Sequence, residues 1–240
     1  MGRAYEVRKA SIQKTGAIKA KAYSNFAKEI YLAAKKGIPE IGSNISLKRI
    51  VDKAKKEQVP NDIIERAIEK AKGAGLEAYE SVIYEGFGPG ASTLIIKTLT
   101  DNVNRTVSYV RAAFNKVSKS LGVKNSVAYN YDYLAILGIR TNKEEELLLA
   151  LLEANIEPLE FENDQGTIFI SLNPTDVGKA KDVIDSMIEN VDYEVDEVGM
   201  FPKEKVTLNT EDLMIFKKLY YLLDEIEDVV EIYHNVEGDF

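Results

Sequence analysis

Apolar residues recur at helical spacing three times in the first third of the chain. The spacing predicts helices over 18–36, over 45–58, and from Pro60 to the glycines at 73 and 75. Ser43 or Asn44 is placed to cap the second helix, and proline suits the first turn of the third. Because the connections are short, we expect a small three-helix bundle.

The pattern changes at residue 79 to runs rich in β-branched and aromatic residues. Residues 79–87 and 92–100 flank the turn residues GPGA and predict a hairpin. A helix over 103–119 follows, with Asp101 or Asn102 as its cap, and the segment SVAYNY at 126–131 is expected to be a strand.

The next elements form a self-contained cycle. Strands are predicted at 132–139, 157–162, 167–172 and 191–198, with helices at 142–155 and 174–190. This β-α-β-β-α-β order is that of the ferredoxin-like fold. A strand at 205–209, a helix at 210–226 and a strand at 229–236 end the chain.

A β-α-β tail of this size needs another sheet to join. We therefore predict a multidomain α and α+β protein. Residues 1–76 form a basic arm and helical bundle, 77–132 with 202–240 form a discontinuous α+β domain, and 133–201 form a ferredoxin-like insertion within it.

Charge divides the chain unevenly. Residues 1–76 carry 17 Lys and Arg against 8 Asp and Glu, a net of +9, whereas the whole chain has a net charge of −8. A basic segment on an acidic protein indicates a polyanionic partner. The absence of cysteine fits a reducing cytoplasm, and no apolar run is long enough for a transmembrane helix or a secretory signal.

Cations on the arm, on the predicted second helix and at the start of the 103–119 helix are the candidate nucleic-acid contacts, because phosphate neutralisation supplies most sequence-independent affinity. These cations are Arg3, Arg8, Lys9, Lys14, Lys19, Lys21, Lys48, Arg49, Lys55, Lys56, Arg105 and Arg111, and the neutral amide of Asn104 is a further candidate contact. The alternatives are a solvated face for the bundle helices and a simple Asx cap at 102–105.

The loop YEGFGPGAS has three alternating glycines, Gly86, Gly88 and Gly90, around Phe87 and Pro89. A glycine loop can bind phosphate, but the Gly-Lys-Ser/Thr ending of a Walker loop is missing, which favours a hairpin that needs close backbone approach or displays its phenylalanine. With one histidine and no cysteine, the sequence offers no nucleophile–base pair, no cofactor site and no metal site, and the C-terminal acids have no EF-hand spacing.

The runs LKRIVDKAKKEQVPNDIIERAIEKAKG, YEGFGPGAS, LTDNVNRTVSYVRAAF, SVAYNY and IYHNV together resemble the YebC-like family of bacterial regulators and mitochondrial translational activators. The start of the chain and the loop SNISLK are similar to its YeeN-like branch. The resemblance implies three domains arranged as above and a non-enzymatic cytoplasmic protein. It implies either DNA-binding transcriptional regulation or a ribosome-associated role that helps translation past difficult stretches.

This chain departs from the family at two places. The Gly-His-Ser-Lys-Trp start of most relatives is replaced by Gly2-Arg3-Ala4-Tyr5, and the glycine-rich loop before GSVAY is replaced by SKSLGVKN. Contacts made by those segments are not carried over. Two other classes stay open: an adaptor whose acidic domains bind a basic protein, and a phosphate-handling enzyme that uses the glycine hairpin.

Overall fold

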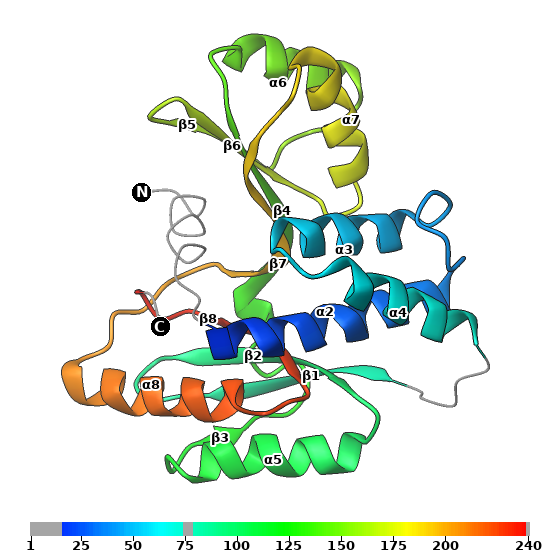
Figure 1. Cartoon of the computed structure of the whole chain (residues 1–240). Coiled ribbons are helices and arrows are strands. Elements are labelled where there is room, and N and C mark those ends of the chain that lie inside the picture. Colours follow the sequence, from blue (N-terminus) through cyan, green and yellow to red (C-terminus); the bar gives the residue numbers. More distant parts are fainter. Residues whose placement is uncertain (1–15, 74–78, 239–240) are drawn as a thin grey trace. The chain divides into compact units, whose positions relative to one another are not determined.

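The computed structural model describes residues 16–73 and 79–238, with only the backbone of 16–20 (Figure 1). The described chain forms two compact units. The larger unit contains the described residues up to 127 together with 207–232, and the smaller contains 128–206 and 233–238.

Three helices form the first layer of the larger unit: α2 (Gly16–Lys36), α3 (Ile45–Lys56) and α4 (Asn61–Lys72). They pack around a core that includes Ile30, Leu47, Val51 and Ile64. Asn44 caps α3 by accepting a hydrogen bond from the Leu47 N–H at 3.0 Å. The predicted three-helix bundle is therefore confirmed.

A four-stranded sheet forms the second layer, in the order β3-β1-β2-β8. Its hairpin pairs β1 (Glu80–Phe87) with β2 (Thr93–Thr100), antiparallel from Glu80 opposite Thr100 to Phe87 opposite Thr93. The edges are β3 (Ser120–Leu121), a two-residue strand that the sequence did not predict, and β8 (Val229–His234).

Helices cover both faces of β2. Lys97 bonds to Glu29 of α2, whereas a Cβ on Gly86 would meet the ring of Phe114 from α5 (Val103–Asn115). Gly86 pairs with Leu94, an odd number of residues from Lys97, so the two contacts lie on opposite faces of the pleated sheet. Helix α8 (Thr210–Asp224) contacts α5, and the core position Leu94 of β2 is fully buried.

The smaller unit has the predicted ferredoxin-like topology. Its elements are β4 (Tyr131–Arg140), α6 (Glu144–Glu153), β5 (Glu160–Asp164), β6 (Thr167–Leu172), α7 (Val177–Met187) and β7 (Tyr193–Pro202). The sheet order is β5-β6-β4-β7, with all neighbours antiparallel. Both helices pack on one apolar cluster that contains Leu137, Leu147, Ile170 and Ile184.

Two predicted strands were wrong. Most of SVAYNY is a loop and a short 3-10 helix (Ala128–Asn130), and only Tyr131 begins a strand. The reason is that the Glu85 carboxylate accepts the backbone N–H of Val127, which would otherwise serve a strand partner. The predicted strand at 205–209 is reduced to a single parallel bridge between Val206 and Val236.

The helix predicted at 103–119 ends at Asn115. Ser118 takes a positive φ of 55°, and the Lys119 N–H returns to the Phe114 carbonyl at 3.0 Å. The mixed α and α+β class is confirmed. The boundaries at 1–76, 77–132 with 202–240, and 133–201 stay a prediction.

Candidate nucleic-acid interface

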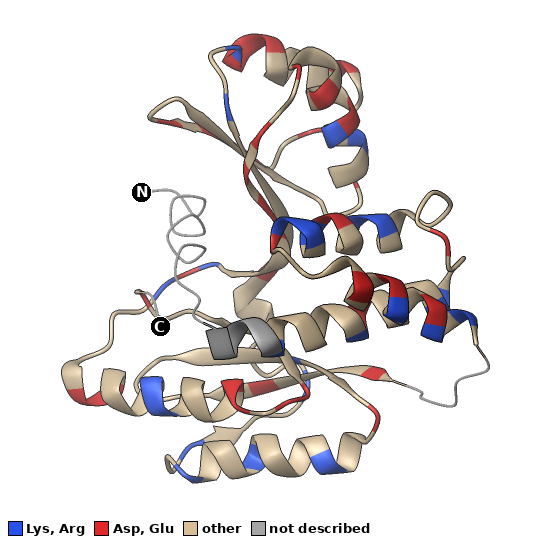
Figure 2. Ribbon diagram, in the orientation of Figure 1, with Lys and Arg blue, Asp and Glu red and all other residues tan. Residues whose placement is uncertain are grey.

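The outward face of α3 is the clearest exposed cationic surface among the described residues. Leu47, Val51 and Ala54 are buried at helical spacing, which turns the intervening positions outward. Figure 2 colours the Lys and Arg positions along α3 blue. Lys48, Arg49, Lys55 and Lys56 of the predicted set are all exposed there, and Asp52 is the one acid on the helix. We name Lys48, Arg49 and Lys55 the α3 cations.

Lys53 of the same helix has a different environment. Its Nζ lies 4.0 Å from a carboxylate oxygen of Glu231, on β8. Glu231 also receives a hydrogen bond at 2.9 Å from Lys97, whose ammonium lies 3.3 Å from Glu29 on α2. Burial by itself would lower the pKa of Lys97, but Glu231 and Glu29 outweigh it and raise that pKa above its usual value. This cluster joins the bundle to the sheet.

Lys21, from the predicted set, also serves this junction. Its Nζ forms an ion pair at 2.8 Å with Asp224 at the end of α8 and also bonds to the Asp224 carbonyl. Next along α2, the Asn25 amide donates to the Val229 carbonyl at 3.3 Å. The side chain of Lys21 is thus partly buried between α2 and the α8–β8 connection.

Arg105 is held in a second ionic cluster. Its Nη2 lies 2.7 Å from Asp101 and 3.1 Å from Asp228. Asn102 caps α5 by accepting from the Arg105 N–H at 3.0 Å, so the predicted cap of this helix is confirmed. The predicted neighbours Asn104 and Arg111 are exposed on α5.

Asp228 is a buried carboxylate that the sequence reasoning missed. It accepts hydrogen bonds from the hydroxyls of Thr106 at 2.7 Å and Thr100 at 3.2 Å, besides Arg105, and the Lys28 ammonium lies 3.8 Å away. Burial alone would raise the pKa of Asp228, but the hydrogen bonds from Thr106 and Arg105 and the charges of Arg105 and Lys28 hold that pKa below its usual value. In the sequence, Asp228 is one of several acids in DEIEDVVE, and no local pattern distinguishes it from its neighbours.

Helix α5 and the loop after it lack acidic residues. From residue 102 to residue 131 there is no Asp or Glu, while Arg105, Arg111, Lys116, Lys119 and Lys124 supply five cations. In Figure 2 the α5 ribbon accordingly carries blue positions and no red ones. The stretch thus adds cations to the larger unit outside the bundle.

The glycine hairpin is closed by its own hydrogen bonds. The Gly88 N–H donates to the Ser92 carbonyl at 2.9 Å, and the Ser92 hydroxyl donates to the Pro89 carbonyl at 2.6 Å. Gly90 has a φ of +60°, and Gly86 lies so close to Phe114 that a Cβ would come within 2.3 Å of its ring. A Cβ on Gly88 would lie 2.3 Å from the Ser92 hydroxyl oxygen, so geometry explains all three glycines, and Phe87 is exposed.

Glu85, next to the hairpin tip, organises the loop that follows α5. Its buried carboxylate accepts the backbone N–H groups of Asn125 at 2.6 Å and Val127 at 2.7 Å. A carboxylate bound by two amides fixes the chain around the exposed Lys124.

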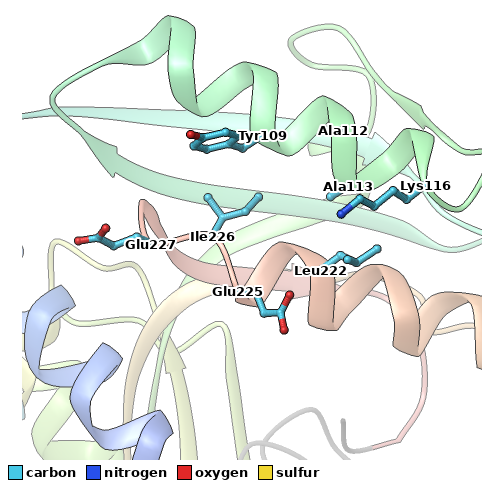
Figure 3. A pocket seen from close by; sticks show the side chains of 8 residues that line it. All are labelled: Tyr109, Ala112, Ala113, Lys116, Leu222, Glu225, Ile226 and Glu227. Atoms are coloured by element: carbon cyan, nitrogen blue, oxygen red, sulfur yellow. The ribbon is translucent and has the colours of Figure 1, made fainter.

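A hollow of about 280 Å³ lies between α5 and the end of α8 (Figure 3). Tyr109 and Lys116 line it from α5, and Glu225 and Glu227 from the other side. The two carboxylates would repel phosphate, so this hollow does not extend the cationic surface.

Part of the predicted set cannot be placed. Arg3, Arg8, Lys9 and Lys14 lie outside the described residues, as does the side chain of Lys19. Within the described part, no cluster of three or more His, Asp or Glu is arranged to hold a metal ion, and none of its helices is long and apolar enough to cross a membrane.

Comparisons with known proteins find relatives that match nearly the whole chain. The chain is 40% identical over 237 residues to a "Probable transcriptional regulatory protein" of Alcanivorax borkumensis, covering 99% of each. It is 43% identical to a protein of the same name from Acholeplasma laidlawii, covering 98% of each. The crystal structure of a "Conserved Hypothetical Protein" from Aquifex aeolicus matches with a TM-score of 0.75 and 30% identity, over 93% of this chain and 92% of that one.

Two family models account for nearly the whole sequence. The model described as "TACO1/YebC protein N-terminal domain" matches residues 3–74, and "TACO1/YebC second and third domain" matches residues 79–236. The chain therefore belongs to the TACO1/YebC family.

Proposed function

We propose that this protein is a non-enzymatic regulator of gene expression that binds nucleic acid through its N-terminal bundle and acts in the cytoplasm. The observation that carries the proposal is the α3 face, where Lys48, Arg49 and Lys55 are exposed on a helix whose other side is fully packed. The name shared by the relatives, "Probable transcriptional regulatory protein", supports the same class.

Phosphate neutralisation is the source of affinity in this proposal. The α3 cations bind backbone phosphates, and the arm residues Arg3, Arg8, Lys9 and Lys14 add to them. The acid-free α5 stretch supplies a second contact through Arg111 and the lysines that follow it. No set of side chains suited to reading base edges stands out, so we expect weak sequence preference.

Binding to labelled duplex DNA and to ribosomal RNA fragments, measured by fluorescence anisotropy across a salt series, tests the proposal. We expect affinity to fall steeply with salt. Changing the arm residues Arg3, Arg8, Lys9 and Lys14 together with Lys19 to Ala should remove most of the affinity, whereas Lys21 is left in place because it pairs with Asp224. An affinity that does not change with salt concentration would contradict the proposal.

The partner in the cell is either DNA or the ribosome. Sedimentation of lysate through a sucrose gradient, with the full chain and with residues 1–17 removed, separates them. Co-migration with ribosomes that is lost on truncation favours a translation factor that contacts ribosomal RNA and relieves stalling. Absence from ribosomes, together with binding to promoter fragments, favours a transcriptional regulator.

A second candidate function rests on the acidic part of the chain. Residues 133–201 carry 16 Asp and Glu against 4 Lys and Arg, a net of −12, which suits an adaptor for a basic protein. Affinity capture from nuclease-treated lysate distinguishes the two. Partners that survive nuclease favour the adaptor, and partners that are lost favour nucleic acid.

A further inference from the structure

The connection between α2 and α3, together with the first residue of α3, exposes three isoleucines within eight residues. Ile38 is 57% exposed, Ile41 is 36% exposed and Ile45 is 83% exposed. We call these three residues the isoleucine loop. Large apolar side chains gathered in one short exposed segment often mark a contact surface, whereas singly scattered ones do not.

Hydrogen bonds hold the isoleucine loop in this form. The Asn44 amide nitrogen donates to the carbonyl of Ala33 at 3.0 Å and to the carbonyl of Ile38 at 2.9 Å, while its oxygen caps α3. Gly37 is required beside it, because a Cβ there would lie 2.6 Å from the Asn44 nitrogen. A turn closes the loop through the Ser43 N–H and the Glu40 carbonyl at 3.1 Å. The isoleucines are thus presented by a preorganised backbone.

Cations flank this apolar loop in the sequence. Lys36 precedes it at the end of α2, and Lys48 and Arg49 follow it on α3, all three exposed. The one acid between residues 35 and 49 is Glu40, which accepts a hydrogen bond from the Ser43 hydroxyl at 3.2 Å. A polyanion that also offers apolar surface matches this combination. Duplex DNA does so, since its phosphates flank grooves floored by stacked bases.

We propose that the isoleucine loop is an apolar wedge that enters the minor groove of duplex DNA and partly unstacks a base step. Isoleucine is among the side chains that architectural proteins insert in this way, kinking the duplex. Lys48 and Arg49 bind the phosphates beside the insertion and set its position. This inference rests on the proposed nucleic-acid binding and specifies how the bundle engages its partner.

The test uses a duplex that carries 2-aminopurine at a central TA step and a fluorophore pair at its ends. The full chain should raise 2-aminopurine fluorescence and shorten the end-to-end distance. The variant I38S/I41S/I45S should lose both signals and bind about tenfold more weakly, with an unchanged salt slope, because no cation is removed. The matched control is Ile83→Ser on β1, an isoleucine of similar exposure at 56%, which should behave as wild type.

Several outcomes would overturn the inference. Salt-dependent binding without unstacking or bending would reject the wedge while leaving the proposed function intact, and absence of binding to DNA and RNA would reject both. Binding to an RNA hairpin, and to vesicles of phosphatidylserine and phosphatidylcholine, is measured alongside. If one of these binding reactions requires the isoleucines and binding to DNA does not, the loop is assigned to that other partner. Thermal unfolding of each variant checks folding, and Ile45→Ser alone replaces the triple variant if that variant unfolds.

Discussion

The lysines and arginines of the larger unit divide into two groups with different surroundings. The α3 cations project from a helix whose packed face needs none of them. Lys21, Lys97 and Arg105 instead contact Asp224, Glu231 and Asp228, all near the α8–β8 connection. Residues of one type thus tie α2, β2 and α5 to the α8–β8 segment in one place and are exposed on α3 in another.

The comparison also changes the meaning of the basic charge. A net of +9 over residues 1–76 indicates a polyanion in the sequence, yet part of that charge pairs with acids between 224 and 231. Charge at the junction contributes to stability, whereas the proposed function assigns the charge on α3 to affinity for nucleic acid. Variants of the two groups should therefore affect different measurements.

The largest expected effect is on stability. Asp228→Ala removes the acceptor shared by Thr100, Thr106 and Arg105 and leaves these donors without it. We expect the free energy of unfolding in urea to fall by about 3 kcal/mol, because breaking a buried ionic network from one side is costly. Asp101→Ala, which removes the exposed partner of the same arginine, is the control and should cost less than about 1 kcal/mol.

A smaller effect is expected on affinity when the α3 cations are removed. K48A/R49A/K55A should weaken binding to duplex DNA by about 2 kcal/mol, roughly 30-fold, with an unchanged melting temperature. Lys179 of α7, Lys203 after β7 and Lys218 of α8 are exposed lysines outside the bundle, and a variant that removes all three changes the net charge equally. It serves as the control in the same anisotropy assay. Equal losses in both variants would mean that net charge alone, rather than the α3 face, determines binding.

Lys97→Met should have a more modest effect, on stability only. It leaves Glu29 and Glu231 facing each other without their shared ammonium, and we expect a loss of about 1 kcal/mol because the cluster is partly screened by solvent. The pKa of Lys97 is raised in the folded state, so its contribution is complete below the unfolded pKa and is lost as pH rises through the folded value. Urea unfolding at neutral and strongly alkaline pH checks both points. If the stability difference between wild type and Lys97→Met grows as the pH rises, the prediction is wrong.

The smallest expected signal is the acid dependence of the Asp228 contribution. Its folded pKa is lowered, so the contribution is complete above the unfolded pKa and disappears as pH falls through the folded value. The stability difference between wild type and Asp228→Asn should therefore stay level from about pH 8 to about pH 5 and shrink below about pH 4. If the stability difference between wild type and Asp228→Asn instead grows as the pH falls, the pKa of Asp228 is not lowered in the folded state.

Local patterns in the sequence were sufficient for most of the fold. The helix caps at Asn44 and Asn102, the β1–β2 hairpin and the ferredoxin-like order follow from spacing and turn chemistry over a few residues. The failed strand at 126–131 had the right composition. It does not form because the Val127 N–H donates to the carboxylate of Glu85, which is 42 residues away in the sequence. Such tertiary competition for a backbone N–H leaves no local signal.

The candidate site was only partly predictable for the same reason. The outward positions of α3 follow from helical periodicity, and they are exposed as expected. The pairing of Lys21 with Asp224 and of Arg105 with Asp228 joins residues 203 and 123 positions apart. No periodicity connects such residues, so the sequence could not separate junction cations from surface cations.

The most direct test of this division is the slope of log affinity against log salt for duplex DNA. It should be measured for wild type, for K48A/R49A/K55A and for K21A/R105A under conditions where all three are folded. Each lost phosphate contact lowers the slope by about 0.9, so the α3 variant should lose between two and three units. K21A/R105A should keep the wild-type slope, because neither side chain contacts phosphate. A wild-type slope in K48A/R49A/K55A, or an equal loss of slope in K48A/R49A/K55A and K21A/R105A, would contradict the division into surface and junction cations.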